Sequence, residues 1–213
     1  MTADAPRLSC RGLALSVAGR MLVSGLDLDV RAGECWVVIG PNGAGKTTLL
    51  TALAGLRAAQ AGAIAYDGTP LTALGLRERA RRRGFLPQDS VDHFPATVLE
   101  TALVGRHPHL ARWQWESAAD IDRARAALST FGLAGLDDRD ARTLSGGDRR
   151  RLALAALVAQ DSGLLLLDEP SSHLDLGAQV AALDTVAALA RNQGKAIVMV
   201  LHDLHLALRY ADH

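Results

Sequence analysis

Features of secreted, membrane-spanning and nucleic-acid-binding proteins are largely missing from this sequence. Its 2 cysteines, Cys10 and Cys35, are too few for a disulfide scaffold and do not form a spaced metal-binding motif. Residues 1–6 hold no apolar stretch like that of a signal peptide, and no apolar run reaches the length of a membrane span. Positive and negative residues number 23 each, without a long basic run. We therefore expect a soluble protein of a reducing cytoplasm, with no nucleic-acid partner.

Aromatic residues are also scarce, at 4%, while hydrophobic residues make up 49% of the chain. The core should therefore be mostly aliphatic. A length of 213 residues suits one large α/β domain, or a core domain that carries an inserted lobe. Lysine occurs only at Lys46 and Lys195, because nearly every positive residue is arginine. Genome composition explains this bias most simply, and the bias makes Lys46 stand out.

The strongest motif is a glycine-rich stretch of the form G-x-x-x-x-G-K-T. Residues 35–39 before it favour a strand, and residues 48–54 after it are apolar at helical spacing. A strand, a turn and a helix N-terminus form an anion site, because backbone N–H groups and the helix dipole point at the ligand. We expect this phosphate loop to bind a nucleotide. It consists of Gly40, Pro41, Asn42, Gly43, Ala44, Gly45, Lys46, Thr47 and Thr48.

Two motifs predict a site for Mg²⁺ beside the phosphates. Lys46 is expected to reach the β- and γ-phosphates, and the Thr47 hydroxyl to ligate the metal ion. Downstream, the apolar residues 164–167 end in Asp168 and Glu169, like the strand with which phosphate-loop ATPases hold Mg²⁺. Asp168 would bind the ion directly or through water, and Glu169 would polarise the water that attacks the γ-phosphate. The alternative is that both carboxylates only cap the end of a strand.

A third motif, Leu144-Ser145-Gly146-Gly147-Asp148, directly precedes a helical pattern. Ser145 is a typical helix-start residue, and Gly146 and Gly147 free the backbone for an anion contact at the helix N-terminus. An ordinary junction between a loop and a helix is the alternative. One nucleotide does not need two such anion sites in one subunit. Two facing subunits, however, can each supply one to the other's nucleotide.

The first part of the chain predicts short strands with one exposed helix. Residues 8–30 alternate between apolar and polar around a turn at 18–20, which indicates antiparallel strands. Residues 62–68 and 85–88 also favour strands, and the arginine-rich residues 74–83 favour a helix on the surface. Residues 8–30 therefore predict an N-terminal antiparallel β subdomain that leads into the strand before the phosphate loop.

The later part of the chain predicts a parallel sheet. Residues 163–167 and 195–201 are nearly continuous apolar runs, and helical patterns occupy residues 148–160 and 176–193. Strands of this kind in alternation with helices indicate a parallel sheet that is covered on both faces. Between the two parts, residues 89–143 show only helical periodicity, which predicts a separate helical lobe.

In their order and spacing, these motifs resemble those of the nucleotide-binding subunit of ABC transporters. The resemblance implies one α/β domain over residues 1–213 with a P-loop NTPase core in residues 1–88 and 144–213. A helical subdomain would be inserted at residues 89–143. The matching elements are the phosphate loop, Gln88 of the Q-loop, the signature at residues 144–148, Asp168 and Glu169 of the acidic strand, Asp175 of the D-loop and His202, the switch histidine.

The resemblance also implies a head-to-tail homodimer that sandwiches ATP between its subunits. Ser145 and Gly147 would contact the γ-phosphate across the interface, and His202 would hold the γ-phosphate and the water. Gln88 would link the metal ion to the helical subdomain, while Asp175 would communicate between the two sites. Taken singly, these residues have structural alternatives: a satisfied histidine, a strand end and a helix N-cap. Order and spacing support them, and their individual chemistry does not.

Two residues depart from the family pattern. ABC proteins often stack an aromatic residue on adenine, and the matching position here is Val17. Trp36 is close in sequence, but it belongs to the expected strand before the phosphate loop. Adenine would then receive an apolar contact instead of stacking, which weakens the inference that the site selects this base. The other departure is Asp148, where glutamine or glutamate is usual, and it keeps the acidic character of that position.

Further resemblances point to a class of transporter. Residues 95–100, 104–109, 158–162 and 202–207 resemble ATPases of importers for iron-siderophore, haem and cobalamin, and so does a valine at position 17. The cargo cannot be derived, because the ATPase does not touch it. The resemblance implies a separate integral membrane permease and, indirectly, a substrate-binding protein. The chain would then lie at the cytoplasmic face of the inner or plasma membrane, attached through the permease.

His107 and His109 invite interpretation as a metal site, but two histidines without a third ligand make a weak one. A lobe surface near the permease is the preferred interpretation. Three alternatives for the function stay open: the ATPase of another ABC system such as a haem exporter, a soluble ABC ATPase of repair or translation, and a non-hydrolysing ATP-binding scaffold. Relatives usually continue beyond the switch histidine with further strands and a helix, so a truncated C-terminus is also among the expectations.

Overall fold

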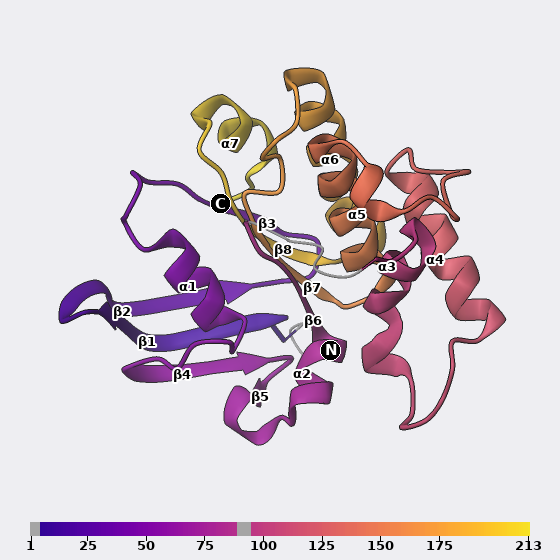
Figure 1. The fold of residues 1–213 in the computed structure, drawn as a ribbon. Helices are drawn as coiled ribbons and strands as arrows, with labels where there is room; N and C mark the ends of the chain where they lie inside the picture. The colour runs from indigo at the N-terminus through magenta and orange to yellow at the C-terminus, as the bar shows by residue number, and fades with distance from the viewer. Residues whose placement is uncertain (1–4, 89–94) are drawn as a thin grey trace.

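The computed structural model describes residues 5–88 and 95–213, which form an antiparallel sheet, a parallel sheet and the helices packed against them (Figure 1). The first sheet is antiparallel, with the strand order β2-β1-β4-β5. The predicted turn at residues 18–20 connects its two long strands. The strands are β1 (Leu8–Val17), β2 (Arg20–Val30), β4 (Ala61–Tyr66) and β5 (Thr69–Pro70).

The second sheet is parallel throughout, in the order β3-β8-β7-β6. Every residue of its two central strands, β7 (Leu164–Asp168) and β8 (Ala196–Val200), is buried. Their continuous apolar sequences had predicted a parallel sheet covered on both faces, and the structure confirms it. The edge strands are β3 (Cys35–Val38) and β6 (Arg83–Leu86). Because all strands run the same way, their carboxyl ends lie along one edge.

Two hydrophobic cores lie on opposite faces of the parallel sheet. Along β7, Leu164 and Leu166 belong to the core shared with the antiparallel sheet, while Leu165 and Leu167 face the other core, as the two-residue period of a strand requires. The first core also contains α1 (Lys46–Leu53). The second is covered by α5 (Gly146–Ala159), α6 (Leu176–Gln193) and α7 (Leu204–Tyr210).

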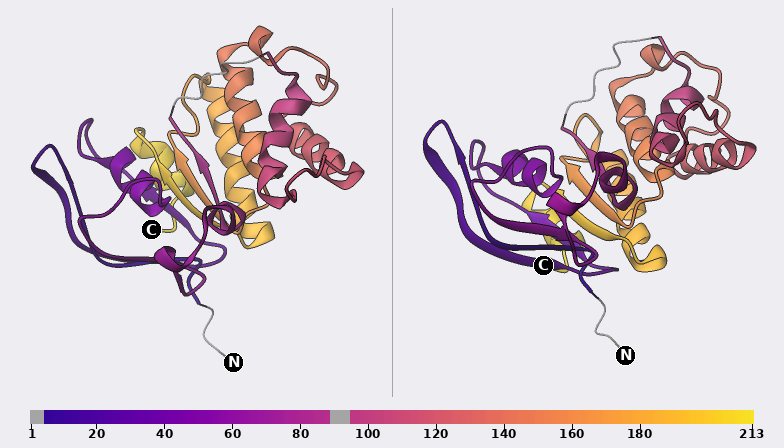
Figure 2. Two further views of the ribbon diagram at one scale, coloured as in Figure 1. Left: turned by 60° about the horizontal axis from the view of Figure 1, so that its bottom comes forward. Right: turned by 90° about the horizontal axis from the view of Figure 1, so that it is seen from below.

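The described residues between β6 and α5, residues 95–143, form a helical lobe at the opposite end of the molecule from the antiparallel sheet (Figure 2). Its first α-helix begins with a capping box of Thr97 and Glu100, and its second with one of Ser117 and Asp120. The predicted insert begins at residue 89, and its residues 89–94 lie outside the described part. The lobe contains α3 (Val98–Leu103), η2 (Val104–His109), α4 (Ala118–Thr130) and η3 (Ala141–Thr143).

The arginine-rich segment differs from its prediction at both ends. A 3₁₀ turn, η1 (Leu71–Ala73), precedes the helix α2, which covers only Leu76–Arg82. Strand β6 begins at Arg83, opposite Leu164 of β7, instead of at Phe85. Pairing with a buried neighbouring strand therefore overrides the helical preference of the last arginine.

Among the described residues, no helix has both the length and the apolar character needed to cross a membrane.

Candidate nucleotide-binding site

The predicted site residues converge where the parallel strands end. The phosphate loop follows β3, Gln88 follows β6, Glu169 follows β7 and His202 follows β8. They surround a cavity of about 670 Å³, whose far end is formed by the two long antiparallel strands. The cavity is lined by Val17, Arg20, Leu22, Asn42, Gly43, Gly45, Lys46, Thr47, Thr48, Gln88, Glu169 and His202.

The phosphate loop wraps the N-terminus of α1, as its sequence predicted. Gly45 caps the helix with a φ of 95°, and an added Cβ there would lie 2.9 Å from Leu22 Cδ1. A side chain at this position would therefore meet both backbone strain and a close contact. Lys46 Nζ donates hydrogen bonds to the carbonyl oxygens of Gly40 and Pro41, at 2.8 and 3.0 Å. These bonds keep the ammonium group over the mouth of the loop.

Asp168 is the last residue of β7, and its carboxylate is an exception to the rule that buried polar groups are paired. The residue is fully buried, and neither oxygen has a hydrogen-bond partner among the described residues. Burial raises the pKa of Asp168, the nearby Thr47 hydroxyl lowers it, and the charge of Glu169 raises it again. An unpaired carboxylate beside a hydroxyl is a donor set that suits Mg²⁺, which prefers oxygen ligands.

Glu169 follows directly, and its backbone has the left-handed conformation, with a φ of 51°. Its N–H donates to the carbonyl of Val200 at 3.2 Å, which ties it to the end of β8. The His202 Nε2 contacts Glu169 Oε1, so the two side chains form one pair at the cavity wall. Strained backbone of this kind costs roughly 1–3 kcal/mol and is typical of functional sites.

The structure adds a residue that the sequence analysis did not single out. Arg150 of α5 is only 4% exposed, and its guanidinium lies between the ends of β6 and β7. It donates hydrogen bonds to backbone carbonyls on both sides. The signal in the sequence was its spacing, because Arg150, Leu154 and Leu157 occupy one buried face of the helix.

Other predicted residues lie outside the cavity lining. Ser145 caps α5, with its Oγ accepting a hydrogen bond from the N–H of Asp148 at 3.1 Å, and Gly146 and Gly147 form the first turn. Asp175 is the N-cap of α6 and accepts a hydrogen bond from the N–H of Ala178 at 2.9 Å. Four further predicted residues also lie outside the cavity lining: Gly40, Pro41 and Ala44 of the phosphate loop, and the buried Asp168.

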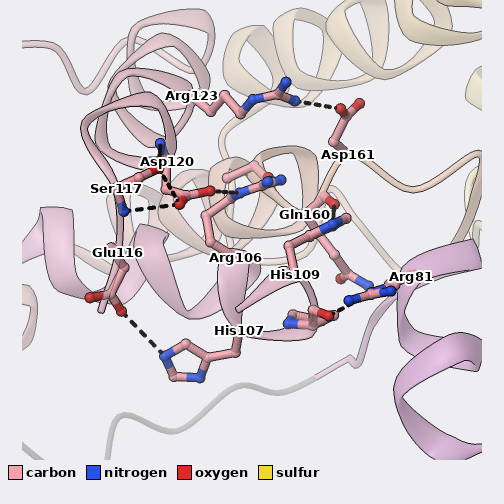
Figure 3. A network of polar contacts seen from close by, with 12 residues as sticks. Arg81, Arg106, His107, His109, Glu116, Ser117, Asp120, Arg123, Gln160 and Asp161 are labelled. Atoms are coloured by element: carbon pink, nitrogen blue, oxygen red, sulfur yellow. Dashed lines mark hydrogen bonds and ion pairs between the residues drawn. The ribbon is translucent and has the colours of Figure 1, made fainter. Parts of the chain in front are cut away.

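The two lobe histidines have separate structural partners (Figure 3). The His109 Nε2 donates to the carbonyl of Gln160 at 2.8 Å, and His107 Nε2 lies 3.8 Å from Glu116 Oε1. Within residues 5–88 and 95–213, no group of three or more His, Cys, Asp or Glu side chains is arranged to hold a metal ion.

Sequence comparison places the chain among known proteins. The family model described as ABC transporter matches residues 23–172. The hemin import ATP-binding protein HmuV of Myxococcus xanthus is 44% identical over 211 residues, which cover 96% of this chain and 78% of the relative. The cobalamin import ATP-binding protein BtuD of Halobacterium salinarum is 40% identical over 206 residues. That match covers 96% of this chain, and the chain spans about half, 51%, of the relative's length.

Solved structures agree with the sequence comparison. A metal-chelate type ABC transporter in an inward-facing conformation matches with a TM-score of 0.83 and 30% identity, over 97% of this chain and 77% of the other. A nucleotide-free ATP-binding cassette from an ABC transporter matches in fold with a TM-score of 0.84 at 23% identity, over 96% of this chain and 85% of the other. The chain therefore belongs to the ATP-binding proteins of ABC transporters, a family of ATPases.

Proposed function

We propose that this chain is the ATPase subunit of an importer whose cargo is a haem, a cobalamin or an iron-siderophore complex. The observation that carries the proposal is the cavity in which the phosphate loop meets Glu169 and His202, with the unpaired carboxylate of Asp168 behind Thr47. The cargo class follows the relatives, which import hemin, cobalamin and, in Bacillus anthracis, petrobactin. We also propose the division into a core, residues 1–88 and 144–213, and a helical subdomain, residues 89–143.

In this proposal the phosphate loop holds the triphosphate of ATP through its backbone N–H groups, and Lys46 turns from the loop carbonyls to the β- and γ-phosphates. Thr47, Asp168 and Gln88 would hold Mg²⁺, which would neutralise charge on the phosphate oxygens. Val17 offers adenine an apolar contact at the far end of the cavity.

The pair of Glu169 and His202 positions the attacking water. The Nε2–H of His202 engages Oε1 of Glu169, which leaves Oε2 to accept the proton of the water. Because Glu169 is held in a left-handed conformation at the end of β7, its carboxylate is directed into the cavity instead of along the strand. Developing charge on the γ-phosphate is stabilised by Lys46 and the N-terminus of α1.

We infer that the site is completed by a second copy of the chain in head-to-tail arrangement. Ser145, Gly146 and Gly147 lie at an exposed helix N-terminus outside the cavity, so they are free to meet the γ-phosphate of a partner. Asp175 lies at another exposed helix start and would relay between the two sites. A bacterial ABC transporter cassette with the same fold is a dimer, at a TM-score of 0.82 and 22% identity.

The permease of the proposed importer would dock against the helical lobe, which places the chain at the cytoplasmic face of the membrane. A cleft of about 380 Å³ lies between β6, α5 and the lobe, with Val104, Ala153 and Ala156 among its lining residues. Closing of the dimer around ATP would move the lobe and the permease with it, and hydrolysis would let the dimer open. A substrate-binding protein would act on the other side of the permease.

Phosphate release from Mg-ATP by the full chain tests the ATPase assignment. Wild type should turn over, whereas Glu169→Gln should bind ATP, form the dimer and release almost no phosphate, because it lacks the proton acceptor. Full hydrolysis by Glu169→Gln would overturn the role of this carboxylate. Co-purification of the chain with its permease, followed by uptake of haem, cobalamin and ferric siderophore into vesicles, tests the cargo class. Export of any of these would overturn the importer assignment.

A further inference from the structure

Among the described residues, Arg150 donates its hydrogen bonds to backbone carbonyls. Nη1 donates to Pro87 and Gln88 at 2.8 and 3.1 Å, and Nη2 to Asp168 and Glu169 at 2.7 Å each. Nε donates to the carbonyl of Pro170 at 3.2 Å. A guanidinium has five N–H groups in one fixed plane, so a single side chain can donate to carbonyls of both segments.

The carbonyls belong to the two segments that carry the proposed chemistry. One segment leads from β6 to Gln88, and the other leads from Asp168 through Glu169 to Pro170. Both segments leave neighbouring strands, since β6 pairs directly with β7. Arg150 therefore bridges the Gln88 and Glu169 backbones just beyond the last pair of the two strands, Leu86 and Leu167.

The second segment needs such support, because Glu169 is a non-glycine residue at a φ of 51°. A strained conformation persists only where surrounding contacts over-determine it. Arg150 binds the carbonyl of Glu169 and the carbonyls on either side of it, so it holds the peptide planes that set where the Glu169 side chain points.

Arg150 also belongs to the helix that begins at the signature. It lies one turn into α5, whose N-terminal turn contains Gly146 and Gly147. The neighbouring Arg149 is exposed on the same helix. A shift of α5 would therefore be transmitted through Arg150 to Gln88 and Glu169 of the same chain. In the proposed dimer, these two residues serve a different nucleotide from the one that the signature of this chain contacts.

We propose that Arg150 is a positioning residue for ATP hydrolysis, which sets Gln88 and Glu169 relative to each other and couples them to the signature helix. This inference rests on the proposed function. A positive charge alone cannot hold the two segments together. A lysine ammonium has three donors at a single point and cannot bind two segments in one plane.

The test compares Arg150→Lys with Arg149→Lys, the same change one position along the helix at an exposed side chain. For each full-chain variant, turnover at saturating Mg-ATP, the Kd for ATP and the Tm are measured, with turnover expressed per nucleotide-binding site. Arg150→Lys should lose about 100-fold in kcat, as expected for a misplacement of about 1 Å, with a Kd close to that of wild type. Arg149→Lys should match wild type in all three measurements.

A purely structural role for Arg150 would lower Tm and the number of binding sites together and leave turnover per site unchanged. That result, or equal kcat for the two lysine variants, would overturn the inference. The ATPase assignment is judged separately, since it fails only if wild type itself releases no phosphate.

A second variant keeps the test decisive if Arg150→Lys does not fold. Arg150→Ala is purified in the presence of methylguanidinium, which is then dialysed away and added back. Turnover should rise several-fold with methylguanidinium and not with methylammonium at the same concentration, because only the former can bridge both segments. Equal responses to the two cations, or no response to either, would overturn the inference.

Discussion

Two buried aspartates, one at the end of β7 and one in the helical lobe, have opposite environments. Asp168 has no hydrogen-bond partner for either oxygen among the described residues, and burial raises its pKa. Asp120 accepts hydrogen bonds from the hydroxyl and N–H of Ser117 and from the Arg106 Nε, at 2.6, 3.0 and 2.9 Å (Figure 3). The Ser117 hydroxyl and the Arg106 guanidinium hold the pKa of Asp120 at about 2.

The Asp120 carboxylate stabilises the fold through its hydrogen bonds, whereas burial of the Asp168 carboxylate costs stability. Arg106 also donates to the carbonyl of Ala159 at 2.9 Å, so the Asp120 network fastens η2 and α4 to the end of α5. The Asp168 side chain makes no such hydrogen bonds among the described residues, and an unpaired buried charge opposes folding. A cost of this kind is typical of groups retained for binding or catalysis.

The largest expected effect is on turnover. Asp168→Asn should reduce ATP hydrolysis about 1,000-fold, because removal of the carboxylate that we propose as a metal ligand would forfeit several kcal/mol of charge stabilisation in the transition state. Its Tm should equal or exceed that of wild type, since a buried charge is removed. Phosphate release and thermal unfolding measure the two quantities. Near-normal turnover in Asp168→Asn would show that this carboxylate, like that of Asp120, is not needed for hydrolysis.

The converse variant should affect stability instead. Asp120→Asn should lower the free energy of unfolding by about 3 kcal/mol, because it leaves the buried Arg106 without its counter-charge. Turnover of the folded protein should stay within about twofold of wild type, an effect of less than 0.5 kcal/mol on the barrier. Chemical denaturation and phosphate release provide the readouts. A stable but inactive Asp120→Asn would show that the lobe aspartate also serves the chemistry.

Acid should erase the stabilisation by Asp120. A folded-state pKa of about 2, below the ordinary 3.8, means that the ionised group stabilises the fold above about pH 4. That contribution is lost as the pH falls from about 4 through 2. The stability difference between wild type and Asp120→Asn should therefore narrow over this window in denaturation curves. A constant difference down to pH 2 would indicate that side-chain shape, and not ionisation, stabilises the lobe.

The smallest effect is expected at Val17, where we propose that adenine binds. Val17 is 38% exposed, and Val17→Tyr would supply a ring for stacking. Stacking is worth about 1 kcal/mol, so ATP should bind about fivefold more tightly. Met21→Tyr serves as the control, because Met21 lies opposite Ser16, one position along the β1–β2 pair from Val17, and outside the cavity lining. Equal affinity of the two variants, measured by nucleotide titration, would place adenine elsewhere.

The sequence predicted the positions of the phosphate loop, Asp168 and Glu169 because their chemistry depends on local patterns that follow a strand. The sequence could not predict that β4 pairs with β1 in the antiparallel sheet, since that pairing joins residues far apart in the chain. It also could not distinguish Arg150 from Arg149 by residue type. Their roles differ through the rotation of a single helix, and only the packed structure shows which arginine faces inward.

The two-sided burial of β7 has a consequence for cooperativity. Leu164 and Leu166 belong to one core and Leu165 and Leu167 to the other, so both cores share one stretch of backbone. Loss of either core would expose a full face of β7 and remove support from the opposite leucines. The antiparallel sheet and the helix layer are therefore expected to unfold in one transition, because β7, the strand that ends at the proposed nucleotide site, belongs to both cores.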